Sequence, residues 1–239
     1  MQITDLKTLD YPPLTDDLEE AKSHLDKYGM ALIKDVLSQE EVEEMDQRLN
    51  EQFMGEEKYQ VGSKIRGDEG FGIESSEEEK VSRLVWNLIN KGDCFLKLID
   101  HPKILPLIQH MIGERVCLCS MGAHMNGSGN ERMALHQDQW PLVPHPMKFP
   151  FMANVMYLIS DNSPENGGTR LIPGSHKWPL IDYKTANSED IQKKAVSLTA
   201  PKGTAIVWEG RLWHGNGLNR SGAIRSLSLI HISEPTRPS

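Results

Sequence analysis

The sequence has few cysteines, few basic residues and no long apolar run, and each shortage excludes a class of protein. Three cysteines among 239 residues, with no Cys-x-x-Cys pair, argue against a disulfide framework and a zinc knuckle. The 26 Lys and Arg residues stand against 34 Asp and Glu residues, which gives a net charge of −8. This balance argues against nucleic acid as the main partner, because phosphate binding needs clustered basic side chains.

Membrane and secretion signals are also missing. No apolar run approaches the roughly 20 residues that cross a bilayer. The segment Met1–Leu6 lacks the basic and then apolar layout of a signal peptide. We therefore expect a cytoplasmic protein with no membrane partner, and the sequence gives no indication of its oligomeric state.

What is present describes an ordinary globular chain, with 38% hydrophobic and 25% charged residues. The length suits one domain, which we expect over residues 1–226. Within it we expect a helical part over residues 1–114 and a strand-rich part over residues 115–226.

Apolar residues recur at helical spacing in the first part. They predict helices over residues 18–28, 38–53, 81–88 and 101–112, and a short strand over residues 30–36. Ser38 and Glu41 fit a capping box at the start of the second helix. Residues 54–80 show no period, and we interpret them as a long surface loop that is either a lid, with Tyr59 and Arg66, or loosely ordered.

The second part is predicted to be built from short strands that Gly, Pro, Asn and Asp punctuate. They fall over residues 116–121, 153–159, 169–172 and 204–208, with a partner strand over residues 223–226. Helices first and strands second predict an α+β domain with a mainly β core, a β-sandwich or jelly roll, and the helices packed outside.

Three residues form a candidate metal site. His136 and Asp138 lie two apart, so on a strand they would point to the same face. This pair is a weak signal alone, because a surface turn gives the same pattern. His214 follows a predicted strand and precedes a Gly- and Asn-rich turn. Two imidazoles and one carboxylate on one side of an ion leave the other side open, which is typical of non-haem Fe(II) sites.

Arg225 lies on the strand predicted after that turn, where its guanidinium could capture a carboxylate beside the metal. The alternative is a solvated charge on an edge strand. His124 is a further histidine near the predicted strands, and such a residue is more often structural or substrate-facing than a ligand.

Three motifs carry a family resemblance. Leu135–Trp140, Glu165–His176 and Trp213–Gly217 with Arg225 resemble the phytanoyl-CoA dioxygenase family of Fe(II)- and 2-oxoglutarate-dependent oxygenases. The resemblance runs from about residue 16 to residue 226. It implies a double-stranded β-helix core, that is a cupin-like jelly roll. It also implies the following roles, given by residue: iron ligands His136, Asp138 and His214; 2-oxoglutarate contacts Arg225 and Thr169; site lining Gln139 and Trp140.

The implied activity is a dioxygenase reaction that uses Fe(II), 2-oxoglutarate and O₂, hydroxylates a small-molecule substrate and releases succinate and CO₂. Related halogenases carry a small residue in place of Asp138, so the carboxylate favours hydroxylation. Two alternatives stay open: a non-catalytic jelly roll that binds a metal or ligand, and a cupin-like metalloenzyme that does not use 2-oxoglutarate. The sequence does not identify the substrate, although the lack of a basic cluster disfavours acyl-CoA.

The last residues are unusual. Leu227–Arg237 resembles the translation of a common sequencing-library adapter, so we expect residues 227–239 not to belong to the natural protein. The alternative is a genuine strand at a sheet edge, since Leu227, Leu229 and Ile230 are apolar.

Overall fold

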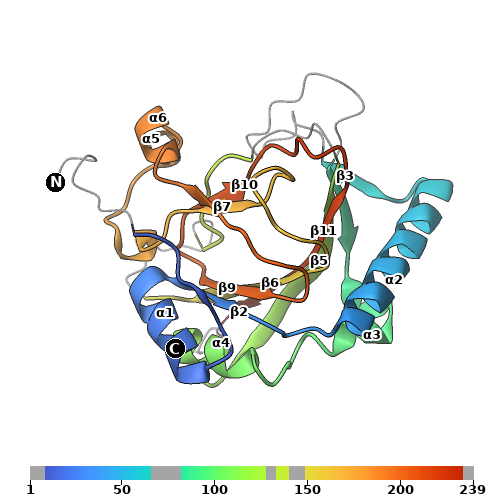
Figure 1. The fold of residues 1–239 in the computed structure, drawn as a ribbon, viewed down its shortest axis with the longest axis horizontal. Helices are drawn as coiled ribbons and strands as arrows, with labels where there is room; N and C mark the ends of the chain where they lie inside the picture. The colour runs from blue at the N-terminus through green and yellow to red at the C-terminus, as the bar shows by residue number, and fades with distance from the viewer. Residues whose placement is uncertain (1–8, 66–81, 128–132, 140–148, 234–239) are drawn as a thin grey trace, which may run out of the picture.

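Two β-sheets face each other and helices cover their outer sides (Figure 1). The computed structural model describes residues 9–65, 82–127, 133–139 and 149–233. The larger sheet has the order β1 (Leu14–Thr15), β2 (Met30–Ile33), β9 (Ala205–Glu209), β6 (Met152–Leu158), β11 (Arg225–Ser233), β5 (Cys117–Asn126), β4 (Ser82–Trp86), β3 (Ser63–Ile65). The smaller sheet has the order β10 (His214–Asn216), β7 (Thr169–Leu171), β8 (Val196–Ser197).

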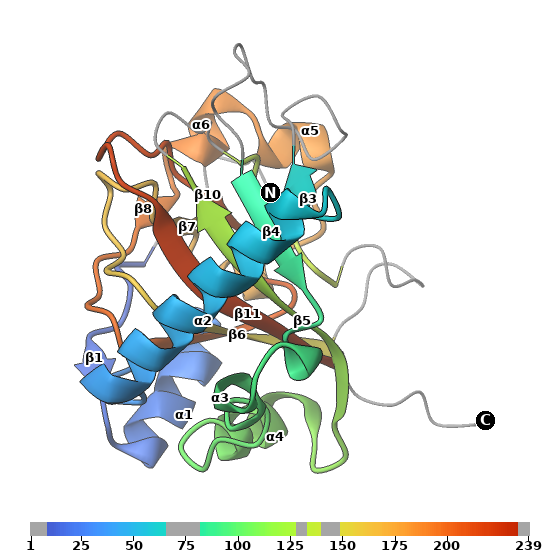
Figure 2. The same cartoon turned by 90° about the vertical axis from the view of Figure 1, so that its right-hand side faces the viewer.

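The helices lie outside this pair of sheets. They are α1 (Leu18–Tyr28), α2 (Gln39–Lys58), α3 (Asp93–Leu96), α4 (Leu105–Ile112), α5 (Tyr183–Ala186) and α6 (Glu189–Gln192), with 3₁₀ turns η2 (Leu88–Asn90) and η3 (Ser175–Lys177). Figure 2 shows α2 crossing in front of β4, and the Arg83 guanidinium of β4 lies 4.2 Å from the ring centroid of Phe53 in α2. None of the described helices is long and apolar enough to cross a membrane.

The core has two layers because the larger sheet is buried on both faces. Ala31 and Ile33 of β2 pack outward against the helices. Met30 and Leu32 alternate with them and pack inward, between the two sheets. All seven residues of β6 are buried for the same reason. The inner layer is mostly apolar. Buried polar residues such as His214 and Arg225 are the exceptions.

Local signals in the sequence set most of the helices. The capping box of Ser38 and Glu41 is present in α2, and Gly29 ends α1 in the left-handed conformation with φ 76°. The predicted helix over residues 81–88 is wrong, because Ser82–Trp86 pairs with β5 as strand β4. A short apolar run fits a helix and a strand equally well, and here the pairing with β5 favours the strand.

The predicted loop over residues 54–80 is wrong at its start. Helix α2 continues to Lys58, and Ser63–Ile65 forms β3. Tyr59 of the predicted lid is the C-cap of α2 and is 71% exposed, whereas residues 66–80, which include Arg66, lie outside the described residues. Residues 227–233 continue β11, which pairs with both β5 and β6 and is therefore an internal strand rather than an edge.

Candidate metal centre

The three candidate ligands come together between the two sheets. His136 and His214 form an isolated antiparallel bridge, with N–O distances of 2.9 and 3.0 Å in the two directions. Nε2 of His136 lies 3.6 Å from Oδ1 of Asp138, and Nε2 of His214 lies 3.2 Å from its Oδ2. One ligand atom of each residue falls within 4.8 Å of the other two. This backbone bridge is what brings residues 78 positions apart in the chain to one centre.

Backbone carbonyls orient both imidazoles. Nδ1 of His136 lies 3.1 Å from the carbonyl oxygen of Ala134, and Nδ1 of His214 lies 2.9 Å from that of Leu212. A carbonyl can only accept, so each Nδ1 carries the proton and donates. Each Nε2 therefore faces Asp138 and is the atom that would bind a metal once it carries no proton.

The charges of the centre suit a cation. Burial lowers the pKa of His136 to about 4, and the charge of His214 adds to this. Burial alone would raise the pKa of Asp138, but His214 and His136 outweigh it and hold that pKa below its usual value. The same pairing outweighs burial at His214 and raises its pKa. Oδ2 of Asp138 is buried and accepts no hydrogen bond from the described residues, so an ionised oxygen is left for a metal ion.

A buried cation lies near the centre. Arg225 is 1% exposed, and its Nη1 donates to Oδ1 of Asn162 at 3.2 Å. Its Nε and Nη2 have no hydrogen-bond partner in the part of the chain that the structure describes. Burial lowers the pKa of Arg225 to about 10, which leaves the guanidinium charged at neutral pH. A buried charge with two free donors fits a carboxylate supplied from outside the chain.

Thr169 lies on the neighbouring sheet and is joined to Arg225 through Asn162. Oδ1 of Asn162 also accepts from the backbone N–H of Thr169 at 3.1 Å. Strand pairing places Thr169 opposite Asn216, two residues along β10 from His214. The structure thus brings the two predicted 2-oxoglutarate contacts to one side of the metal centre. Sequence reasoning missed Asn162, because no spacing rule marks a single asparagine in an isolated β-bridge, here with Ala200.

The Gly-Gly pair before Thr169 has a steric explanation. A Cβ on Gly168 would lie 2.5 Å from the carbonyl oxygen of Ser163 and 2.7 Å from Nδ2 of Asn162. Only a residue without a side chain lets these segments approach so closely. Gly168 therefore helps to place both Asn162 and Thr169.

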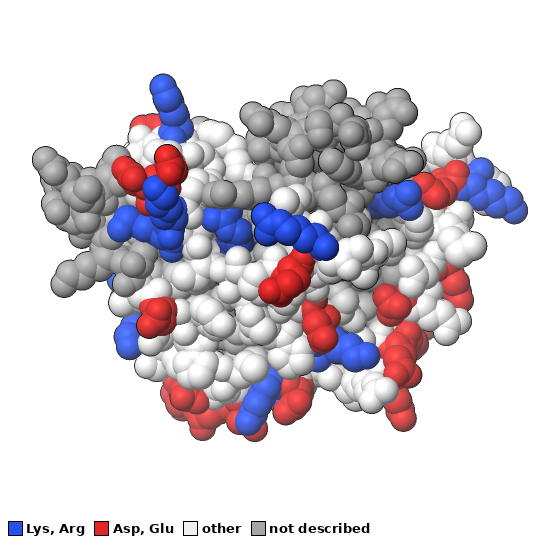
Figure 3. All heavy atoms as spheres, turned by 45° about the horizontal axis from the view of Figure 1, so that its top comes forward, with Lys and Arg blue, Asp and Glu red and all other residues white. Residues whose placement is uncertain are grey.

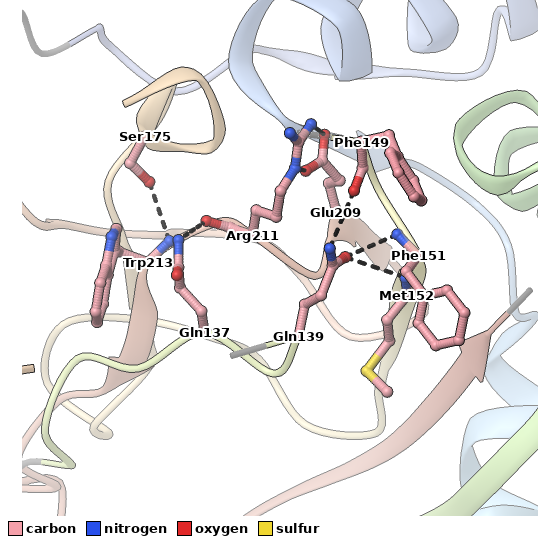
Figure 4. A network of polar contacts seen from close by, with 9 residues as sticks. All are labelled: Gln137, Gln139, Phe149, Phe151, Met152, Ser175, Glu209, Arg211 and Trp213. Carbon is pink, nitrogen blue, oxygen red and sulfur yellow. Dashed lines mark hydrogen bonds and ion pairs between the residues drawn. The ribbon is translucent and has the colours of Figure 1, made fainter. Parts of the chain in front are cut away.

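Gln139 was predicted to line the site, and its side chain bonds to the backbone at the start of β6 (Figure 4). Its Oε1 accepts from the N–H groups of Phe151 at 2.8 Å and Met152 at 3.3 Å, and its Nε2 donates to the carbonyl oxygen of Phe149 at 3.0 Å. Its own N–H donates to Gly210 at 3.0 Å. Gln139 thus ties the segment that carries Asp138 to two neighbouring segments.

The network in Figure 4 also supports the strand of His214. Ser175 Oγ accepts from the N–H of Trp213 at 3.0 Å, and the Gln137 side chain donates to the carbonyl of Arg211. Trp208 had no predicted role in the site. Its ring centroid lies 5.2 Å from that of His214. Trp140 lies outside the described residues.

Comparison with known proteins supports the motifs. The family model described as phytanoyl-CoA dioxygenase matches residues 25–227. Dioxygenase af480 of Aspergillus fumigatus is 30% identical over 223 residues, which cover 93% of this chain and 69% of that protein. A probable alpha-ketoglutarate-dependent hypophosphite dioxygenase of Stutzerimonas stutzeri is 26% identical over 233 residues, which cover 89% of this chain and 77% of that protein.

Solved structures share the architecture. The non-heme alpha-ketoglutarate-dependent epimerase SnoN from nogalamycin biosynthesis has a TM-score of 0.70 at 18% identity, over 92% of this chain and 83% of that one. HygX from Streptomyces hygroscopicus, with nickel, 2-oxoglutarate and hygromycin B bound, has a TM-score of 0.67 at 17% identity, over 90% and 86%. This likeness confirms the predicted fold class, a jelly roll with helices outside.

Proposed function

This chain belongs to the phytanoyl-CoA dioxygenase family and is an Fe(II)- and 2-oxoglutarate-dependent dioxygenase, and we propose that it hydroxylates a small organic molecule. The family, the enzyme class and the cofactors that the sequence predicts are confirmed. The roles of single residues and the nature of the substrate are the proposed part.

We assign iron binding to His136, Asp138 and His214. The fit of the donors supports this, since both Nε2 atoms and an ionised carboxylate oxygen converge with nothing else bound to them in the described residues. An iron ion held by His136, Asp138 and His214 would keep coordination positions free for 2-oxoglutarate and O₂. Bound iron with 2-oxoglutarate supplies the oxidising power, and the reaction releases succinate and CO₂.

The remaining residues bind, orient and exclude water. Arg225 receives the distal carboxylate of 2-oxoglutarate on Nε and Nη2, and Asn162 holds the guanidinium in place. Thr169 is joined to it through Asn162, and its hydroxyl, which donates to Sδ of Met156 at 3.4 Å, would donate to the bound 2-oxoglutarate instead. The apolar inner layer excludes water from the reacting centre, which protects the substrate oxidation from side reactions. The orphaned guanidinium nitrogens of Arg225 are the observation that carries the use of a dicarboxylate, and they disfavour a cupin-like enzyme without 2-oxoglutarate.

Two solved structures of the same fold support a small organic substrate, whereas the hypophosphite dioxygenase is named for an inorganic anion. SnoN is described in complex with nogalamycin RO, and HygX with hygromycin B. A CoA thioester is disfavoured, because its phosphates need a basic cluster. On the face drawn in Figure 3, Lys and Arg side chains stand singly or beside acidic ones rather than in one patch.

The test is an anaerobic titration of Fe(II) and 2-oxoglutarate into the metal-free protein, following the visible charge-transfer band of the chelate. We expect the band in the parent, its loss in His136→Ala, and a need for much more 2-oxoglutarate in Arg225→Gln. Arg83→Gln, on the outer face of β4, is the matched control and should behave as the parent. A parent protein that binds Fe(II) but gives no band would overturn the proposal.

A further inference from the structure

The inner face of the larger sheet carries a tryptophan and a histidine that the proposed chemistry does not use. Strand pairing sets Asn126 of β5 opposite Arg225, so Asn126 faces the site. His124 and Gly122 lie two and four residues before it on β5 and share that face. Trp86 of β4 pairs with Gly122 and shares it too. Their neighbours Val85 and Ala123 point the other way, into the outer core.

His124 is a neutral hydrogen-bonding group beside the metal centre. Burial, followed by the charge of Arg225, lowers the pKa of His124 to about 3, and Asp138 and His136 are close enough to act on it as well. No hydrogen bond joins the His124 ring to any described residue. The residue is half-buried, so part of it is accessible to a bound molecule. A neutral imidazole offers one donor and one acceptor, so His124 has both to give to a bound molecule.

Trp86 supplies a flat apolar surface next to it. The residue is 49% exposed, which is unusual for a tryptophan on the inner face of a sheet. The indole lies over Gly122, since a Cβ there would be in ordinary van der Waals contact with Cε3 of Trp86, at 3.6 Å. Such an exposed aromatic face stacks well on another ring.

Among the described residues, the positions of β4 and β5 that share this face with Trp86 are neutral. They are Leu84, Ser120, Gly122, His124 and Asn126. Once 2-oxoglutarate is bound, Arg225 is neutralised by its carboxylate. A charged substrate group would therefore lose its hydration at this wall without gaining a partner.

Resting on the proposed function, we propose that Trp86 and His124 form the substrate subsite and select an uncharged, ring-bearing molecule with a hydroxyl or carbonyl group. The ring stacks on the Trp86 indole, and the polar group exchanges a hydrogen bond with the His124 imidazole. Both residues determine specificity, and neither takes part in binding iron or 2-oxoglutarate.

The experiment measures binding of two matched probes, 2-naphthol and 2-naphthoate, by anaerobic equilibrium dialysis of the protein saturated with Fe(II) and 2-oxoglutarate. The parent should bind 2-naphthol about ten-fold more tightly than 2-naphthoate. His124→Leu should weaken 2-naphthol binding about three- to ten-fold, and His124→Gln, which keeps a donor and an acceptor, should restore most of it. Trp86→Leu should weaken both probes, and Trp86→Phe should weaken them less.

The controls are His110→Leu on α4 and Tyr183→Leu on α5, two surface positions that should leave both affinities unchanged. The charge-transfer band is recorded for every variant and should persist in all of them. Equal 2-naphthol affinity in the parent and His124→Leu, or a preference for 2-naphthoate, would overturn the subsite. Loss of the band in His124→Leu alone would also overturn it, by assigning His124 to cofactor binding. Absence of the band in the parent would instead remove the proposed function, and the subsite with it.

Discussion

Arg225 and Asn162 share a buried hydrogen bond, from Nη1 to Oδ1 at 3.2 Å, that fixes the guanidinium while leaving its Nε and Nη2 without a partner among the described residues. The Asn162 side chain thus orients the Arg225 guanidinium, whose two remaining donors can bind an anion. The same Asn162 oxygen accepts from the backbone of Thr169, so both sheets meet at this point.

Replacing Arg225 should act on 2-oxoglutarate rather than on iron. Arg225→Gln removes the charge and should raise the Kd for 2-oxoglutarate about 10- to 150-fold, because a hydrogen bond to a charged group contributes about 1.5–3 kcal/mol. Asn162→Ala keeps the charge of Arg225 but removes the hydrogen bonds of Asn162 to the guanidinium, to Thr169 and to Leu198, and it should raise this Kd less. The measurement is titration of 2-oxoglutarate into Fe(II)-loaded protein, and an unchanged Kd in Arg225→Gln would contradict the assignment.

Gln139 should affect the position of Asp138 and the stability of the fold together. Gln139→Ala leaves the buried N–H of Phe151 without its partner, so we expect a loss of about 1–3 kcal/mol in the free energy of unfolding. Fe(II) should also bind several-fold more weakly, since the segment beside Asp138 is released. Urea unfolding and Fe(II) titration measure the two effects. Gln109→Ala is the matched control, because that amide makes an exposed bond to Glu114; an equal effect there would refute the role of Gln139.

Two glycines should respond to alanine in opposite directions. Gly168→Ala places a Cβ 2.5 Å from the Ser163 carbonyl oxygen, so we expect a loss of about 1–3 kcal/mol in stability and weaker 2-oxoglutarate binding. Gly55→Ala in α2 meets nothing within 4 Å and should gain about 0.5–1 kcal/mol, because alanine restricts the unfolded chain and favours the helix. Thermal unfolding of both variants checks this contrast, which a gain in Gly168→Ala would reverse.

His176 should make the protein less stable in mild acid. Burial, followed by the charges of Lys177 and Arg211, lowers its pKa from 6.5 to about 4. Between these two pKa values the unfolded chain is protonated at His176 and the folded chain is not. The contribution of His176 to the free energy of unfolding is therefore fully present above pH 6.5 and is lost as the pH falls toward 4. The loss from this group is on the order of 3 kcal/mol. His176→Gln should flatten the fall in urea unfolding between pH 7 and pH 5, relative to the parent; parallel curves would rule out the contribution of His176.

We further propose that residues 1–226 are one natural domain and that residues 227–239 are foreign to it. Because β11 pairs on both sides, the natural gene should encode another strand in their place, with apolar residues at positions 230 and 232, which face the outer core. Sequencing the gene from genomic DNA across codon 226 decides the matter. An uninterrupted reading frame that encodes the same tail would show the proposal to be wrong.

Short-range signals let the sequence determine much of this protein. The apolar period from Leu18 to Tyr28 ends at Gly29, and Ser38 with Glu41 caps α2, because each of these features involves residues within a few turns. The residue types and order of His136, Asp138, His214 and Arg225 were equally sufficient to suggest a metal centre with a carboxylate clamp. Donor chemistry is a property of the residues themselves.

Tertiary structure alone decided the rest. Ser82–Trp86 is a strand because β5 pairs with it, and the side-chain amide of Gln139 bonds to backbone groups of Phe149, Phe151 and Met152. Asn162 is placed in the site by its β-bridge with Ala200, which no local pattern marks. These outcomes depend on hydrogen bonds between segments far apart in the chain, and the free energy of such pairings is set by which groups the fold brings together, not by the neighbours of a residue in sequence.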